Sequence, residues 1–565
     1  MSGPVKVDVL VVGSGAAGLS AAVTAAMHGA SVMMAEKASV LGGTSAWSGG
    51  WLWIPRNPLA RAEGIDEAAD APLTYLQHEM GGEAADIRLQ TFLRYGPEMV
   101  EFFHQRTAVQ FLSGSAMPDF HPSPGAANGG RSVTAHPYDG RLLGDWLHRL
   151  RPPLETISQG GMGIAGGADM AHFFNATRSP RSALYAARRL LRHGWQRLRA
   201  GRGQHLVNGN ALVARLLRSA LDAGVRFQLN APVVRLLQGP PGVSGAVLRS
   251  DSGEIHVEAG AVVLACGGFP HDRQRLAQVV PHAAEGYGHF SAAPPDNQGE
   301  GIRLGESVGG QFDTSLRHPL AWAPVSRVTL ASGQQLMFPH LVERAKPGVI
   351  AVLPNGKRFV NEADSYHDFI AALLAATPAG DTPQAWLLAD RRTLRRYGLG
   401  HARPFPFTPT AWLRTGYLQR GNTLAELAKQ CAIDANALAE TVERFNHFAS
   451  AGEDVDFHRG ASAYNRAQGD HQVTLGPLRE GPFYAVRILP GSLGTFSGLQ
   501  TDEHARVLDE QQQPIPGLYA IGNDMSSVMR GYYPSGGITL GPAMTFGYLV
   551  GKNLAKKTNI NNNIT

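Results

Sequence analysis

Hydrophobic residues near the N-terminus form a run that changes character halfway along. Residues 7–12, Val-Asp-Val-Leu-Val-Val, are mostly β-branched, whereas residues 19–29 are rich in alanine, and glycines separate the two halves. A short β-branched run, a glycine-rich turn and an alanine-rich run predict a strand, a tight turn and a helix. Because Asp8 and three glycines interrupt the apolar stretch, it does not predict a membrane span.

Three further apolar runs of strand length lie far apart along the chain. Residues 31–35 follow the first helix, residues 261–265 are followed by Cys-Gly-Gly, and residues 518–521 are followed by Gly-Asn. Short, continuous apolar runs bounded by turn residues are typical of fully buried strands. Each run alone is compatible with any core strand and turn, but their shared form predicts one α/β domain built from both chain ends.

The turn after the first strand carries a spacing with a defined chemistry. Gly13, Gly15 and Gly18 form a GxGxxG pattern, and Glu36 ends the second strand. In a strand–turn–helix unit these glycines permit a tight turn, close approach of a pyrophosphate and close helix packing, while the acid binds the ribose hydroxyls. We therefore predict a bound dinucleotide without a 2′-phosphate. The predicted contacts are Gly13, Gly15, Ala16, Ala17, Gly18, Glu36 and Lys37.

A second loop of small residues, residues 41–50, follows the acid directly. Simple NAD dehydrogenases continue here with further strand–helix units, whereas a second Gly/Ser/Thr-rich loop suits a cofactor that extends past its pyrophosphate to a buried ring. This loop therefore favours FAD over NAD. Together with the glycine-ended strands it adds the predicted contacts Gly42, Gly43, Thr44, Ser45, Gly49, Gly50, Ala265, Gly267, Gly522 and Asn523.

Residues 531–547 predict a glycine-rich loop that leads into a helix near Thr539. Gly536 and Gly537 leave backbone N–H groups uncovered, and the helix start adds free N–H groups and the positive end of a dipole. Such an end suits an anion, for example a reduced flavin or an enolate that develops during a reaction. Taken alone, the segment is equally compatible with an ordinary helix N-terminus after a turn.

The composition narrows the class of protein. At 565 residues the chain is long enough for two or three structural units, and its 67 glycines suit many close backbone approaches. Two cysteines cannot form a disulfide framework and no signal-peptide pattern opens the sequence, so we expect a cytoplasmic protein. A net charge of +5 without a basic–aromatic groove argues against nucleic acid binding. No metal, iron–sulfur or haem ligand pattern indicates an electron acceptor.

Several motifs resemble, in order and over nearly the whole chain, the flavoprotein family of fumarate reductases, succinate dehydrogenases and 3-ketosteroid dehydrogenases. They are residues 42–45, 265–268, 297–301, 356–362 and 531–547. The resemblance implies a Rossmann-like FAD-binding domain made of residues 1–285 and 479–565, with an inserted α+β substrate domain over residues 286–478. It also implies cofactor contacts at Val233, Asn297, Ile538 and Leu540.

The same resemblance bears on how FAD is attached. Family members that bind FAD covalently carry a histidine in the loop after the acid. Residues 44–48, Thr-Ser-Ala-Trp-Ser, contain none. The resemblance therefore implies non-covalent FAD.

One position separates the activities of this family. In fumarate reductases an arginine that delivers a proton follows four residues after an Asn-Glu pair, whereas Asn361-Glu362 is followed by Tyr366. An arginine suits a dicarboxylate but not the role of a base, while a phenol can accept a proton if its surroundings lower its pKa from ~10. Tyr366 resembles the ketosteroid dehydrogenases and argues against dicarboxylate reduction. The alternative interpretation of Tyr366 is a half-buried helix residue.

The activity that the resemblance implies is α,β-dehydrogenation of a cyclic ketone. In the family a tyrosine hydroxyl and a glycine amide of the C-terminal loop hold the ketone oxygen, and these match Tyr533 and Gly537. Tyr366 would take the α-proton while the β-hydrogen leaves as hydride to flavin N5. A 3-ketosteroid desaturated at the 1,2 position is the substrate expected first. A reductase of an enone or unsaturated acid is the alternative of another class.

Two departures from the 1-dehydrogenases leave the position of the double bond undecided. Those enzymes have a further tyrosine in an Asp-Tyr-Tyr-Pro segment, where this chain has Phe120 and His121. Phe120 cannot relay a proton, whereas His121 either does so or is a simple loop residue. Ser535 resembles the 4-dehydrogenases of 5α-steroids. A 5α-3-ketosteroid and a smaller ring of the cyclohexanone type therefore stay as alternative substrates.

Residues 178–202 form a strongly basic stretch. They contain eight arginines, no acid lies between Asp169 and Asp222, and Leu and Trp recur at roughly helical spacing. A basic amphipathic helix can lie on an anionic membrane surface, which would help a hydrophobic substrate reach the site. A solvated basic face on a core helix is the alternative. The oligomeric state is not indicated, and the asparagine-rich tail, residues 556–565, is expected to be disordered.

Overall fold

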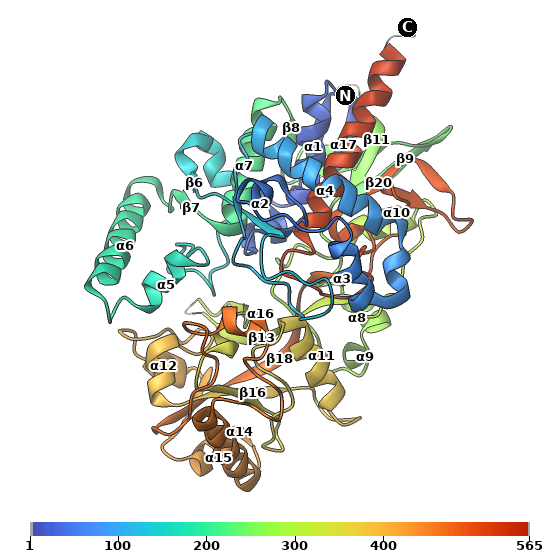
Figure 1. Cartoon of the computed structure of the whole chain (residues 1–565). Helices are drawn as coiled ribbons and strands as arrows, with labels where there is room; N and C mark the ends of the chain where they lie inside the picture. The colour runs from blue at the N-terminus through green and yellow to red at the C-terminus, as the bar shows by residue number, and fades with distance from the viewer. Residues whose placement is uncertain (1–3, 331, 563–565) are drawn as a thin grey trace.

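The computed structural model describes residues 4–330 and 332–562, and both ends of the chain contribute to its larger sheet (Figure 1). In this sheet β1 (Val5–Val12) pairs in parallel with β2 (Val32–Ala35) and with β11 (Gly253–Leu264). β20 (Pro514–Ala520) adds to β11 in parallel. The apolar runs that end in glycine thus lie side by side, as the sequence predicts for buried parallel strands.

Four more strands complete this eight-stranded sheet. The order is β19–β20–β11–β1–β2–β8, with β10 paired to β11 and β9 paired to β10. Three pairs are antiparallel: β10 with β11, β9 with β10 and β19 with β20. The added strands are β8 (Arg226–Gln228), β9 (Val233–Gly239), β10 (Gly242–Ser250) and β19 (Arg506–Leu508).

Helix α1 (Ala16–Met27) packs closely against α17 (Leu540–Asn562) beside this sheet. A Cβ on Gly547 would lie 2.6 Å from the Ala17 carbonyl oxygen, so glycine is needed for the close approach. The contact fixes the loop before α17 next to the turn after β1. The tail expected to be disordered comprises residues 556–565. Residues 556–562 form the last part of α17, and residues 563–565 lie outside the described residues.

A second, seven-stranded sheet is built around the long strand β18 (Phe483–Thr495). Its order is β14–β13–β18–β16–β15, and β12 and β17 also pair with β18. The end expected for the inserted domain, residue 478, falls just before this central strand. The other strands are β12 (Phe290–Ser291), β13 (Leu320–Thr329), β14 (Gln335–Pro339), β15 (Val349–Val352), β16 (Ala385–Ala389) and β17 (Leu418–Gly421).

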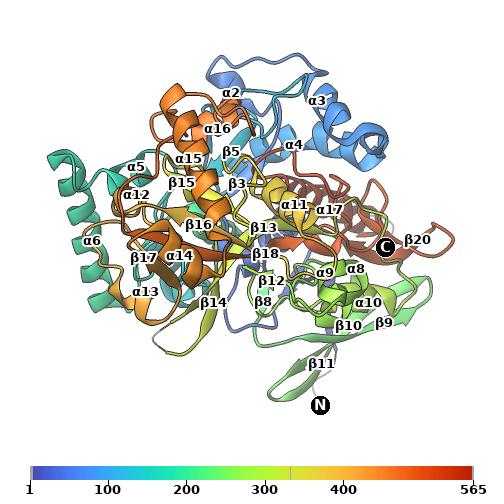
Figure 2. The same cartoon turned by 90° about the horizontal axis from the view of Figure 1, so that it is seen from below.

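The helices between residues 366 and 468 gather around the second sheet, whereas α5 (Ala168–Phe174) and α6 (Pro180–Ala200) lie at one edge of the molecule in both views (Figures 1 and 2). The former group comprises α11 (Tyr366–Ala376), α12 (Arg391–Tyr397), α13 (Thr410–Arg414), α14 (Leu424–Cys431), α15 (Ala435–Ala451) and α16 (Ala463–Gln468). Within residues 4–330 and 332–562, no helix combines the length and apolar character needed to cross a membrane.

The remaining α-helices and strands lie between residues 51 and 306, and these strands form a three-stranded and a two-stranded sheet. They are the helices α2 (Pro58–Ala62), α3 (Ala71–Met80), α4 (Ile87–Arg106), α7 (Asn208–Asp222), α8 (Arg273–Val279), α9 (Pro281–Ala284) and α10 (Glu300–Glu306), and the strands β3 (Trp51–Trp53), β4 (Phe111–Ser113), β5 (Ser132–Ala135), β6 (Tyr138–Asp139) and β7 (His205–Leu206).

Candidate active site

A cavity of about 1290 Å³ is lined by the turn after β1, by the loop before α17, by α11 and by α5 and α6. Sites for one small molecule usually measure about 300–1,000 Å³. The cavity is therefore large enough for a cofactor and a second molecule. Its lining divides accordingly into a glycine-rich end, a group of tyrosines and an apolar end.

The three glycines of the turn after β1 have different roles. Gly13 has a φ of +104°, and a Cβ there would overlap the Ala265 carbonyl oxygen, while a Cβ on Gly18 would overlap that of Gly13. Packing therefore requires these two glycines. A Cβ on Gly15 would meet only Ser45 Oγ, at 3.5 Å, and Gly15 lines the cavity. The start of α1 is thus accessible to a pyrophosphate.

The Glu36 carboxylate is held at the cavity wall by three hydrogen bonds. It accepts from Ser14 N at 3.1 Å, from Ser14 Oγ at 2.6 Å and from Ala38 N at 2.9 Å. The neighbouring Lys37 forms an ion pair with Glu300. A carboxylate fixed at this point of the cavity can accept hydrogen bonds from ribose hydroxyls.

Most of the predicted cofactor contacts line the cavity. They are Gly13, Gly15, Ala16, Ala17, Glu36, Lys37, Gly43, Thr44, Ser45, Gly49, Gly50, Val233, Ala265, Gly267, Asn297, Gly522, Asn523 and Leu540. The other three predicted contacts, Gly18, Gly42 and Ile538, do not line the cavity. Gly18 packs against Gly13, Gly42 donates its N–H to Ser14 Oγ at 3.0 Å, and Ile538 is a buried core residue.

Two tyrosines of the cavity lining contact each other. Tyr366 begins α11, and its hydroxyl donates to that of Tyr533, in the loop before α17, at 2.7 Å. Because the hydroxyl of Tyr366 donates to Tyr533, the O–H of Tyr533 is left to donate to another acceptor. Both side chains line the cavity, so that acceptor can be a ligand.

A lowered pKa would favour Tyr366 as a base, but its surroundings raise the pKa instead. Burial raises that pKa well above its ordinary value, and Tyr533 raises it further by its charge and by the hydrogen bond, although Arg344 opposes the change. Burial also raises the pKa of Tyr533, to about 12, even though the hydrogen bond from Tyr366 lowers it. Both phenols are therefore protonated at neutral pH.

Gly537 offers a second donor next to Tyr533. Its φ is +101°, and a Cβ would lie 2.6 Å from the backbone nitrogen of Trp53. Its carbonyl oxygen accepts from Trp53 N at 3.1 Å and from Gly541 N at 2.9 Å. Gly537 lines the cavity, and no acceptor for its N–H occurs among the described residues. Such an amide is suited to an oxygen that gains negative charge.

The family of the chain follows from its comparison with known proteins. A family described as "FAD binding domain" matches residues 8–540. The chain belongs to this family. It is an FAD-dependent oxidoreductase, and its α/β fold is the FAD-binding flavoprotein fold expected from the sequence.

Named relatives cover nearly the whole chain. It is 39% identical to the 4-oxocyclohex-2-ene-1-carboxylate 5-dehydrogenase of Sinomonas cyclohexanicum, over 97% of this chain and 94% of that protein. It is 35% identical to the 3-oxosteroid 1-dehydrogenase of Mycolicibacterium smegmatis, over 97% of each. A crystal structure of 3-ketosteroid delta1-dehydrogenase from Sterolibacterium denitrificans matches with a TM-score of 0.88 and 36% identity, over 98% of this chain and 100% of that one. The expected resemblance to ketosteroid dehydrogenases is confirmed.

The residues at the glycine-rich end of the cavity fit FAD. Gly15 and Ala16 would hold its pyrophosphate at the start of α1, and Glu36 its ribose. When bound, FAD supplies an acceptor for a hydride. The tyrosine pair and the Gly537 amide lie in the same cavity, so a substrate held by them shares this space with the cofactor.

Phe120 lies within the tyrosine group, next to a residue that the sequence did not single out. Its ring stacks on Tyr533 at 5.7 Å, meets Tyr366 edge-on at 5.6 Å and lies 4.4 Å from the ring of Tyr464, between centroids. Tyr464, on α16, is buried and lines the cavity. Tyr464 is thus a third phenol at the site, and it lies next to Phe120, which stands where the 1-dehydrogenases resemble one another in having a tyrosine. No local motif marks it, because only the fold brings α16 to this site.

The structure does not bring His121 into the cavity lining. Its Nδ1 contacts Glu79 and its Nε2 lies 2.7 Å from Asp368 Oδ2. Burial disfavours the charged imidazolium, but hydrogen bonds and charges from Asp368 and Glu79 outweigh it and raise the pKa of His121 to about 10. A histidine that is charged at neutral pH has no lone pair with which to accept a proton. This geometry supports a structural role for His121.

Ser535 is buried but does not line the cavity either. It lies near Asp119, but its hydroxyl has no hydrogen-bond partner within the described structure. Burial raises the pKa of Asp119, and Arg131 and Trp53 partly lower it again. Asp119 forms an ion pair with Arg131 at 2.7 Å. The serine that resembles the 4-dehydrogenases thus lies near a buried ion pair and outside the cavity lining.

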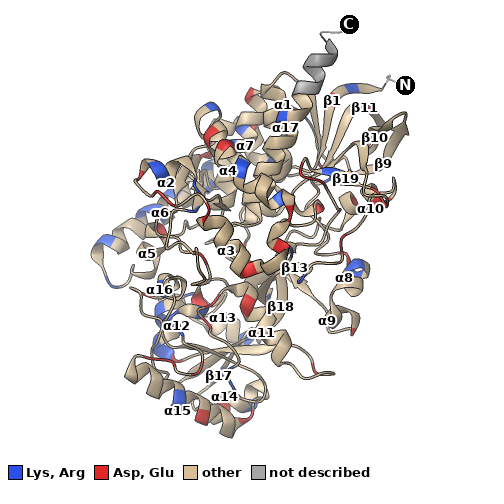
Figure 3. Cartoon of the chain, turned by 45° about the vertical axis from the view of Figure 1, so that its right-hand side comes forward, with Lys and Arg blue, Asp and Glu red and all other residues tan. Residues whose placement is uncertain are grey.

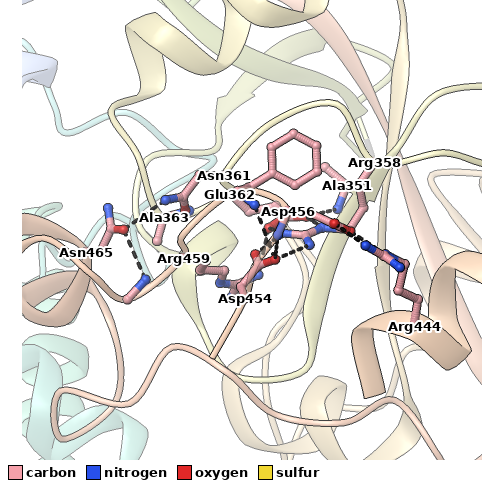
Figure 4. Close-up of polar contacts among 12 residues, drawn as sticks. Ala351, Arg358, Asn361, Glu362, Ala363, Arg444, Asp454, Asp456, Arg459 and Asn465 are labelled. Carbon is pink, nitrogen blue, oxygen red and sulfur yellow. Dashed lines mark hydrogen bonds and ion pairs between the residues drawn. The ribbon is translucent and has the colours of Figure 1, made fainter. Parts of the chain in front are cut away.

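A buried charge network positions the segment before Tyr366 (Figure 4). Arg358 donates to both carboxylate oxygens of Glu362, at 2.8 and 2.7 Å, and Arg459 donates to Glu362 at 3.0 Å. Burial alone would raise the pKa of Glu362, but the two arginines lower it to about 2. Next to it, Asn361 donates to Asn465 of α16 at 2.9 Å. The network therefore ties Tyr366 to the helix that carries Tyr464.

Proposed function

We propose that the protein desaturates a cyclic ketone next to its carbonyl group, with FAD as oxidant. The observation that carries this proposal is the Tyr366–Tyr533 hydrogen bond beside the free N–H of Gly537 in the cavity that fits FAD. A ketone oxygen would accept from the Tyr533 hydroxyl and from Gly537. Two donors at that oxygen stabilise the enolate that forms when the neighbouring carbon loses a proton.

Tyr366 is the group that takes this α-proton. Its hydroxyl contacts Tyr533 at 2.7 Å, so it lies beside the oxygen that Tyr533 holds. The β-hydrogen leaves with its electron pair as a hydride, for which FAD is the acceptor, and a carbon–carbon double bond forms. Because burial keeps Tyr366 protonated, only the minor phenolate form acts as the base.

A 3-ketosteroid desaturated at the 1,2 position is the first candidate substrate. Part of the cavity is lined by large apolar side chains, which suit a fused-ring body. Its lining includes Met170, Phe173, Phe174, Leu190, Phe338, Leu341, Phe405 and Phe407. The relatives named as 3-oxosteroid 1-dehydrogenases support the same assignment.

A small cyclic ketone that bears a carboxylate is the second candidate. Lys346 and Arg403 also line the cavity, and each donates to backbone carbonyls rather than to an acid: Lys346 to Gln468 and Gly469, Arg403 to Thr156 and Ser158. Neither forms an ion pair within the described part of the chain. Burial lowers the pKa of Lys346 to about 8. A substrate carboxylate would favour its charged form, and the Sinomonas relative is named for such a substrate.

Anaerobic mixing of the oxidised holoenzyme with a panel of ketones tests the function. The panel contains 3-ketosteroids, a 4-oxocyclohexanecarboxylate and unsubstituted cyclohexanone. The proposal predicts loss of the oxidised flavin absorbance and a conjugated enone as product, whose double bond is located by NMR. The absence of bleaching with every ketone, together with reoxidation of the reduced enzyme by an enone or unsaturated acid, would favour the reductase instead.

We also infer a cytoplasmic location. The only cysteines in the sequence, Cys266 and Cys431, are both free thiols. Unpaired cysteines are typical of a reducing compartment. Recovery of the protein with the periplasmic or culture fraction would contradict this.

A further inference from the structure

Helix α6 presents its large apolar side chains outward and its small or polar ones to the protein. The side chains buried against the protein are Ser182, Ala186, His193 and Gln196. The exposed fractions of Leu184, Leu191, Trp195 and Leu198 are 73, 76, 56 and 86%. At about 3.6 residues per turn these two sets lie on opposite sides of the helix. The apolar stripe of α6 therefore has no covering element in the described structure.

Exposed arginines border this apolar stripe on one side. They are Arg181, Arg188, Arg192 and Arg199, and Figure 3 shows basic residues along α6. None of these four forms an ion pair among the residues that the structure describes, and Arg199 lies 4.1 Å above the Trp195 ring. By contrast Arg189, on the inner side, pairs with Asp169 at 2.9 Å. The outward face thus combines apolar side chains with unpaired positive charge.

The mouth of the cavity adjoins the same helix. Ala183, Ala187 and Leu190 of α6 line the cavity on the side of the helix away from these arginines. The exposed part of the cavity lining includes four large apolar side chains, Ile157, Leu190, Phe405 and Phe407, and three polar ones, Ser115, Thr177 and His471. The route into the site therefore opens next to the apolar stripe of α6.

We propose that α6 rests on an anionic lipid surface, with the apolar stripe in the headgroup boundary and the arginines on lipid phosphates. A surface-lying helix has this combination of a basic side and exposed Leu and Trp. A second copy of the chain fits less well, because a twofold contact would bring the four arginines of one α6 against those of the other. A lipid surface at the cavity mouth would supply a hydrophobic ketone directly. The supply of a ketone from the lipid rests on the proposed function, whereas the binding of α6 to a lipid surface does not.

Flotation of the holoenzyme with vesicles tests the docking. Vesicles of phosphatidylglycerol and phosphatidylethanolamine are compared with vesicles of phosphatidylcholine. We expect binding to the anionic vesicles that falls with added salt, because surface charge interactions are screened. Since one basic residue near an anionic surface contributes about a fivefold factor, Arg181→Gln/Arg188→Gln/Arg192→Gln should weaken binding about a hundredfold. Leu191→Ser/Leu198→Ser should weaken it as well.

Matched variants on other faces serve as controls. Arg94→Gln/Arg106→Gln/Arg273→Gln removes the same charge from α4 and α8, and Ile87→Ser/Val455→Ser removes exposed apolar side chains. Both should bind as the wild type does. All variants must keep their flavin absorbance and melting temperature. The proposal is overturned if wild-type protein does not float with anionic vesicles, if the controls lose binding equally, or if the α6 variants change only the oligomeric state in sedimentation. Flavin bleaching by soluble ketones is measured separately, so failure of the proposed function does not affect this result.

Discussion

At the scale of single residues, the proposed role of Tyr366 as the base predicts how flavin reduction depends on pH. Tyr533 is buried and Tyr366 is half-buried, and the pKa of Tyr366 lies well above its ordinary value. Below that pKa, the phenolate fraction grows tenfold for each unit of pH. With a saturating non-ionisable ketone, the rate of flavin reduction should therefore rise steadily from neutral pH to about pH 10. Stopped-flow traces across this range provide the measurement, and a plateau near pH 7 would show that another group is the base.

A second residue-scale prediction concerns His121. Its pKa is about 10 in the folded protein and 6.5 ordinarily, so its contribution to stability is complete below pH 6.5 and is lost as the pH rises toward 10. The variant His121→Gln lacks this titration. The difference in melting temperature between wild type and variant should narrow from pH 6.5 to pH 10. A constant difference in melting temperature over that range would contradict the stabilisation of charged His121 by Glu79 and Asp368.

At the scale of elements, the loop before α11 depends on the buried network around Glu362. Removing one charge from a buried, hydrogen-bonded ion pair costs about 3–5 kcal/mol, because the partner stays buried without compensation. Glu362→Gln should therefore lower the free energy of unfolding by that amount. Asp456→Asn, which removes the exposed pair with Arg444, should cost only about 0–1 kcal/mol. Denaturant titration of the two variants makes the comparison, and equal losses would contradict the account.

Local elements could be predicted from the sequence, whereas the environment of the site residues could not. The turn at Gly13 is visible because a strand, three glycines and an acid follow one another within 36 residues. The groups that hold His121 lie 42 and 247 residues away from it, so no local pattern reveals them. Tyr464 was missed for the same reason. The pKa of Tyr366 could not be predicted from the sequence because burial, which raises it, is a property of the folded protein.

At the scale of the whole molecule, both ends of the chain and the second sheet enclose one cavity for cofactor and substrate. The loop of residues 43–50 borders that cavity and contains no histidine. We therefore expect acid precipitation of the holoenzyme to release FAD into the supernatant with its absorbance intact. Flavin fluorescence that stays with the precipitated chain would indicate a covalent bond and contradict this expectation.

The central claim is that Tyr366 removes the α-proton while Tyr533 and Gly537 hold the ketone oxygen. Its most direct test is anaerobic stopped-flow reduction of bound FAD in the wild type and in Tyr366→Phe, with the ketone that bleaches the wild type. The variant should bind FAD normally, since Tyr366 lies at the substrate end of the cavity, and should lose flavin bleaching almost completely. Bleaching by Tyr366→Phe at the wild-type rate would contradict the claim.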